Sequence, residues 1–192
     1  MAAKGQTRGA RSLEEVLEAL ATPSGTPAGG AQAGGDQVEA LATYGREANA
    51  LRARLVRLGE QDGAAYRRVL RARRRPAQSD VQREERERAV EAAMRAATGV
   101  PREIAAACLG VLDVAERATP LVSPSMLGDL VVAAGLASSC AAGAAVLMQL
   151  NVVSLVTDEA VRACSEVAGN DMERASARLE AIEAAVRSQL SP

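Results

Sequence analysis

One stretch limits how this chain can fold more than any other: residues 130–157 contain no charged side chain, although 24% of the whole chain is charged. Charged groups are costly to remove from water, so a long run without them belongs in the interior of a fold. Most of its apolar residues are small, which lets neighbouring helix backbones come close. We therefore expect one central helix, packed on all sides by other helices and by a second subunit.

The same run is long enough to cross a membrane, which takes about 20 apolar residues. However, no Lys or Arg lies close to either end, and polar or very small side chains recur along it: Gly135, Ser138, Ser139, Cys140, Gly143, Gln149 and Asn151. We expect a buried helix and no membrane partner.

The composition favours helices throughout. Hydrophobic residues make up 48% of the 192 residues, yet there are two Tyr and no Phe or Trp, so the core must consist mainly of Ala, Leu and Val. Ala, Leu, Glu and Arg are strong helix formers, and no alternating strand pattern is evident. We predict an all-α helical bundle, with a disordered segment over residues 1–11 and a single domain over residues 12–192.

Charge and special residues exclude several functions. The net charge of −1 gives no general attraction to nucleic acid. The basic segment 71–80 lacks the aromatic residues that stack on bases, so we interpret it as a solvated loop. No histidine is present, which excludes histidine acid–base catalysis and makes a zinc site unexpected. Three widely spaced cysteines and no visible signal peptide indicate a reducing, cytoplasmic location.

Several helices can be placed along the chain. Ser12 and Glu15 form a capping-box pattern before a short amphipathic helix. The glycine-rich segment 22–35 is then either a flexible linker or a loop whose N–H groups face an anion. A long helical pattern follows from Asp36 to Ala72. We also expect helices over 82–98, from Pro101 to Ala118, over the central run, and one or two over 158–190.

Four segments, in order, resemble the cyclodeaminase/cyclohydrolase family, the all-helical folate domain that is fused to formiminotransferase in animals. Residues 26–30 (TPAGG) are similar to that family's TPGGG loop, and residues 62–66 (DGAAY) to its DAEAF. The stretch from Pro76 through VPREIA at 100–105 is similar to its LP…R…VPLEIA run. Residues 129–151 align without a gap on its SD…G…NVxIN pattern. The resemblance covers about residues 13–161.

This resemblance implies a homodimer that binds a reduced folate. The reaction is then loss of ammonia from 5-formiminotetrahydrofolate or opening of 5,10-methenyltetrahydrofolate by water, with the folate as substrate and no further cofactor or metal. On the matching positions, Asp62 is the candidate general acid/base. The resemblance assigns substrate binding to six further residues: Pro27, Gly29, Gly30, Arg46, Asp129 and Asn151.

The chain also departs from the family pattern. It is shorter by roughly two dozen residues between the glycine-rich loop and Asp62, and it carries Ala28, Gly128 and Leu147 where the family has glycine, serine and asparagine. Replacing polar groups by Gly and Leu removes hydrogen bonds to a polar ligand. Besides the hypothesis of a purely structural helical bundle, two functional hypotheses are therefore open. The chain is either a folate one-carbon enzyme, or a diverged homologue that binds another small molecule or a protein.

Overall fold

The computed structural model describes residues 35–152 and 158–191. Within them the chain forms α2 (Gly35–Arg73), α3 (Asp80–Ala118), α4 (Leu127–Val152) and α5 (Asp158–Leu190), with a short 3-10 helix, η1 (Pro124–Met126), before α4. No strand occurs in these residues, so the predicted all-α fold is confirmed. The expected disordered start, the Ser12 helix and the glycine-rich segment up to residue 34 lie outside the described residues, and Gly35 begins α2.

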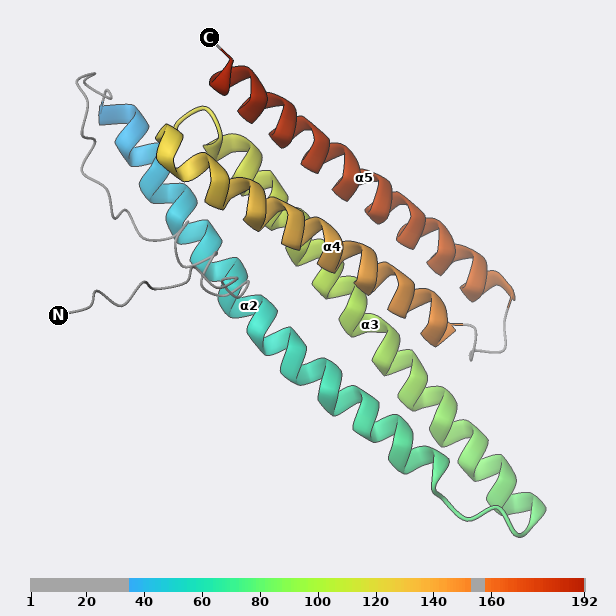
Figure 1. Cartoon of the computed structure of the whole chain (residues 1–192). Helices are drawn as coiled ribbons and strands as arrows, with labels where there is room; N and C mark the ends of the chain where they lie inside the picture. Colours follow the sequence, from blue (N-terminus) through green and yellow to red (C-terminus); the bar gives the residue numbers. More distant parts are fainter. Residues whose placement is uncertain (1–34, 153–157, 192) are drawn as a thin grey trace, which may run out of the picture.

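The α2–α3 pair is a long antiparallel hairpin that extends beyond α4 and α5 at one end (Figure 1). Its turn is closed by a capping box, in which the Ser79 hydroxyl accepts from the Gln82 N–H and the Gln82 side chain accepts from the Ser79 N–H. Nearer the other end, Gly110 of α3 lets the Leu51 side chain approach, since a Cβ there would lie 3.1 Å from Leu51 Cδ2. The predicted 36–72 helix is thus confirmed as α2.

Helix α3 differs from the prediction. We expected two helices separated before Pro101, but α3 is continuous from Asp80 to Ala118 with Pro101 inside it. A proline within a helix has no N–H for the carbonyl four residues earlier, here that of Ala97. That carbonyl accepts a hydrogen bond from Asn151 Nδ2 of α4 at 3.3 Å. Asn151 of α4 thus supplies a donor to the carbonyl that Pro101 leaves without one, and α3 continues through the proline.

Helix α3 lies at the centre of the bundle and packs against α2, α4 and α5. The main core is formed where α3, α4 and α5 meet, and its fully buried side chains include Leu112, Leu130 and Ile182. Alanines fill much of the α3–α4 contact: Ala115, Ala134, Ala137 and Ala141 are all at most 1% exposed. This small-residue core agrees with the one expected from the composition.

Helix α4 is buried on only part of its surface. Ten of its positions are buried, but a continuous stripe along the helix is exposed: Gly128, Val132, Leu136, Ser139, Gly143, Val146, Leu147 and Leu150. We call this stripe the open face of α4. Among residues 35–152 and 158–191, other helices therefore enclose only part of α4, and the second subunit that we expect around this helix is not present in the structure.

The segment Pro124–Val152 is long and apolar enough to cross a membrane, judged by length and composition alone. The core helix of a soluble protein passes the same test, so this feature is weak evidence for a membrane span.

Candidate functional site

Asp62 and Asn151 lie at the same level of the bundle. In the α2–α3 contact, Ala65 packs with Met94 and Ala97, so Asp62, one turn earlier on α2, is level with the turn of α3 just after Ala97. Asn151 of α4 reaches the same place through its hydrogen bond to the Ala97 carbonyl. The proposed acid/base and one proposed folate ligand thus stand beside the same part of α3.

Both side chains are only partly exposed. Asp62 is followed by Gly63 and Ala64, and the guanidinium of Arg67 lies next to Gly63, where a Cβ would be 3.4 Å from Arg67 Nη1. Asn151 uses one amide N–H on Ala97, and its carbonyl oxygen can still accept a hydrogen bond. The sequence assigned Asn151 to ligand binding alone, but the structure also gives it a role in satisfying the backbone at Pro101. In the sequence, Pro101 indicates that the Ala97 carbonyl, four residues earlier, needs a donor from outside the helix.

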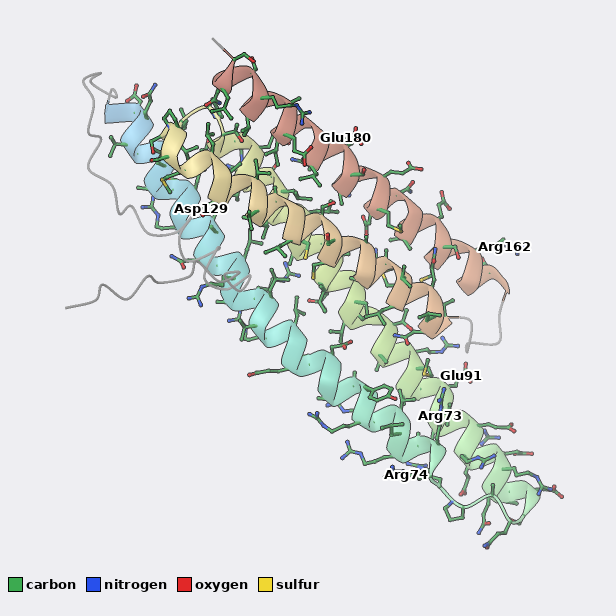
Figure 2. The ribbon with its side chains drawn as sticks, viewed as in Figure 1. Arg73, Arg74, Glu91, Asp129, Arg162 and Glu180 are labelled. Carbon is green, nitrogen blue, oxygen red and sulfur yellow. The ribbon has the colours of Figure 1, made fainter. Side chains whose placement is uncertain are left out.

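Arg46 and Asp129 lie toward the other end of the bundle. Arg46 is exposed on α2 and donates from Nη2 to Thr43 Oγ1 at 3.0 Å. Asp129 is in the first turn of α4, where a carboxylate interacts favourably with the helix dipole. Figure 2 shows Asp129 at the end of the molecule opposite to Arg73 and Arg74, which lie at the hairpin tip.

A network of charged side chains surrounds Arg117 at this end, and the sequence reasoning missed it. Arg117 pairs with Glu47 of α2, its Nε lies 3.0 Å from Asp113 Oδ2, and its guanidinium lies 4.6 Å from the centre of the Tyr44 ring. Arg178 of α5 continues the network, with Nη1 at 3.1 Å from Asp113 Oδ1 and 2.7 Å from Glu116 Oε2.

The hydrogen bond to Glu47 raises the pKa of Arg117 above its usual value. The network joins α2, α3 and α5. In the sequence, only the pairing of Asp113 with Arg117 four residues later on one helix indicated it.

One chain does not bring the two groups together. Sixteen residues of α2 separate Arg46 from Asp62, which corresponds to about 24 Å of helix. Asp129 and Asn151 are separated by 22 residues of α4, or about 33 Å. Pro27, Gly29 and Gly30 lie outside the described residues. A charged groove that the structure does form is at the hairpin tip, lined by Arg73, Arg86 and Glu87 among others, and it contains none of the predicted site residues.

Metal binding was not expected from the sequence. Among residues 35–152 and 158–191, no three His, Cys, Asp or Glu side chains gather as a metal site would require. At the level of Asp62, a carboxylate can transfer a proton and an amide can form hydrogen bonds.

The departures from the family pattern can be located in part. Gly128 and Leu147 both lie on the open face of α4, outside the core of the chain. A Cβ at Gly128 would meet no atom of the described residues within 4 Å, so packing within the chain does not require glycine there. Ala28 is outside the described residues.

Comparison with known proteins bears on the fold and on the family of the chain. No curated protein matches the sequence. The fold is similar to that of the formiminotetrahydrofolate cyclodeaminase of Thermotoga maritima, with a TM-score of 0.73 and 13% sequence identity over 93% of this chain and 83% of that one. The model of the formiminotransferase-cyclodeaminase family matches residues 32–170, which is most of the chain. The chain belongs to the formiminotransferase-cyclodeaminase family.

Proposed function

We propose that this protein is a folate-dependent one-carbon enzyme that works as a homodimer. Its substrate is a tetrahydrofolate derivative, either 5-formiminotetrahydrofolate, which loses ammonia, or 5,10-methenyltetrahydrofolate, which is opened by water. The observation that carries the proposal is the partly buried Asp62 carboxylate beside the level of Asn151, in a chain whose fold is that of a cyclodeaminase. We place the enzyme in the cytoplasm, without metal, further cofactor, nucleic acid or membrane.

Asp62 performs the proton transfer in this proposal. Loss of ammonia needs a proton on the departing nitrogen, and opening of the methenyl bridge needs a proton taken from the attacking water. A single carboxylate can serve either reaction, because it is a base when ionised and an acid when protonated. The amide of Asn151 offers hydrogen bonds to the polar edge of the pterin, as do the backbone groups of Gly29 and Gly30 in the glycine-rich loop.

The second subunit covers the open face of α4. Five large apolar side chains of this face are 37–62% exposed in the single chain: Val132, Leu136, Val146, Leu147 and Leu150. Covering each one contributes about 1 kcal/mol, half of the value for burying such a side chain completely. A Cβ at Gly143, near the middle of the face, meets no atom of the described residues within 4 Å. A partner helix makes use of that glycine, because its backbone can approach closely.

A two-fold axis across the middle of this face completes the site. The open face runs from Gly128 to Leu150, so its midpoint is near Ser139. If two α4 helices pack there in antiparallel orientation, the same patch is used on both subunits, as two-fold symmetry requires. Asn151 of one subunit then lies beside the start of α4 of the other, where Asp129 is. The Asp62–Asn151 group of one chain thus meets the Arg46–Asp129 group of its partner. The cation of Arg46 is then available to the glutamate tail of the folate.

The test is the absorbance of the methenyl group, followed with purified protein in both directions. We expect turnover above the buffer rate, lost in Asp62→Asn. The matched control is Glu60→Gln, which removes an exposed carboxylate two residues earlier on the same helix. It should retain turnover. Unchanged turnover in a folded Asp62→Asn protein would show that Asp62 is not the acid/base.

A second function is favoured by one observation: the family's serine and asparagine are replaced by Gly128 and Leu147, both on the open face. In the antiparallel dimer these two positions lie close to each other across the interface, so an apolar contact takes the place of two polar groups. The fold then serves a dimer that binds a different small molecule or a protein. Absence of turnover together with absence of folate binding in calorimetry, in a well-folded dimer, would select this function.

A further inference from the structure

Two of the three cysteines face each other across the contact between α3 and α4. The hydrogen bond from Asn151 to Ala97 fixes the register of these antiparallel helices. Eleven residues back along α4 from Asn151 is Cys140, and eleven residues forward along α3 from Ala97 is Cys108. Equal steps along two antiparallel helices keep residues level, and eleven residues are close to three full turns, which keeps them on the facing sides.

Burial agrees with this facing arrangement of the two side chains. Cys108 is completely buried in the main core, and the partly buried Cys140 packs against that same core. The neighbouring contacts are made by alanines such as Ala137 and Ala141, so the helices pack at close range. At an axis separation of about 8 Å, facing Cα atoms come within the range of about 4.4–6.8 Å that a disulfide spans.

The two thiols differ in reactivity. The hydrogen bond from Cys108 lowers the pKa of Cys140 to about 7. The hydrogen bond with Cys140, together with burial, raises the pKa of Cys108. Cys140 is therefore the nucleophile of the pair, and in the single chain it is partly exposed whereas Cys108 is completely buried. Cys108 stays protonated and is the second thiol of the pair.

We propose that Cys108 and Cys140 form an oxidisable dithiol site, which a hydroperoxide converts into a disulfide bridge between α3 and α4. This site is independent of the proposed folate chemistry, because neither cysteine takes part in it. Both cysteines are free thiols in the described structure, which is the reduced state of the pair.

The reaction proceeds in two steps. The Cys140 thiolate attacks one peroxide oxygen, the O–O bond breaks, and with hydrogen peroxide the leaving hydroxide takes a proton and departs as water. Cys140 is then a sulfenic acid. The Cys108 sulfur attacks the Cys140 sulfur, the S–O bond breaks, and the hydroxyl leaves with the Cys108 proton as a second water. Two thiols have lost two electrons in total, and the peroxide has gained them. A dithiol reductant reverses the change by exchange.

The three cysteines fall on three different tryptic peptides, which makes the test direct. Cys108 is in 103–117, Cys140 is in 118–162 and Cys164 is in 163–174. The full chain is reduced, freed of reductant, treated with hydrogen peroxide in its native state, alkylated under denaturing conditions and digested. We expect alkylatable thiols to fall from three to one, and peptides 103–117 and 118–162 to appear joined until reductant is added.

Two variants complete the experiment. Cys164→Ser should still form the bridge. Cys140→Ser should lose the joined peptides, and its thermal unfolding shows whether it keeps the fold. Three outcomes would overturn the proposal: all thiols alkylated after peroxide, Cys140 oxidised to the sulfinic acid while Cys108 is alkylated, or a bridge that contains Cys164.

Discussion

The hydrogen bond from Asn151 to the Ala97 carbonyl makes a quantitative prediction about Pro101. The carbonyl lacks a helical donor only because Pro101 has no N–H. Removing the amide with Asn151→Ala leaves a carbonyl without a partner in a partly buried contact, which costs about 1–3 kcal/mol. The 3.3 Å length of the bond places the expected loss toward the lower end, near 1 kcal/mol.

In a Pro101→Ala background the same substitution should cost less, because the substituted residue donates its own backbone N–H to the Ala97 carbonyl. The double-mutant cycle then gives a coupling free energy of about 1 kcal/mol between positions 101 and 151, measured by urea unfolding. The matched control is Gln149→Ala, which removes another amide side chain from α4 and should show no coupling to position 101. Equal costs of Asn151→Ala in both backgrounds would refute the assigned role of Asn151.

Three further predictions follow from the interfaces and the thiols. Leu147→Glu puts a charge on the open face of α4 and should convert the dimer to monomer in sedimentation. The control Val38→Glu, at a 59% exposed position of α2, should leave the dimer intact. A dimer that persists in Leu147→Glu would place the interface elsewhere. Alkylation of Cys140 by iodoacetamide should reach half of its maximal rate near pH 7, since its pKa is lowered to about 7. Burial raises the pKa of Cys164, so its alkylation should require a higher pH than that of an ordinary thiol. Alkylation rates of Cys140 and Cys164 that depend on pH in the same way would contradict this. The Cys108–Cys140 bridge closes a loop of about 30 residues and should stabilise the chain by about 3–4 kcal/mol. The midpoint of thermal unfolding should then rise by roughly 10 °C. A lower midpoint after oxidation would mean that the bridge strains the helices.

Much of the fold could be predicted from the sequence because the signals were local. The charge-free run 130–157 predicted a long helix, and α4 occupies most of it, although the central helix of the bundle is α3 and not α4 as expected. The long pattern after Asp36 predicted α2 nearly to its last residue. Helical periodicity and the small-residue composition were sufficient for these elements.

The predictions were wrong or incomplete where contacts between residues far apart in the sequence determine the local structure. Pro101 is a strong local signal for a helix boundary, and the amide that bonds to the Ala97 carbonyl is that of Asn151, 50 residues after Pro101 in the chain. The charge network around Arg117 likewise joins residues from three helices, so only the part within α3 was visible.

The candidate site was predictable residue by residue but not as an arrangement. Family resemblance assigned Asp62, Arg46, Asp129 and Asn151, yet the geometry of one chain separates them into two groups at different levels of the bundle. A sequence motif does not indicate which subunit of a dimer contributes each of these residues to the site. The open face of α4 is the structural feature that brings in a second copy.

The most direct test of a folate site shared by two subunits is turnover in mixed dimers. Asp62→Asn and Asp129→Asn proteins are prepared separately, mixed under conditions that allow exchange of subunits, and assayed through the methenyl absorbance. Each variant alone carries one substitution in every site and should be inactive. A mixed dimer has one site with both substitutions and one with neither, so the mixture should regain turnover. If the wild-type protein is active, each variant alone is inactive and the exchanged mixture stays inactive, the site lies within one chain and the account is wrong.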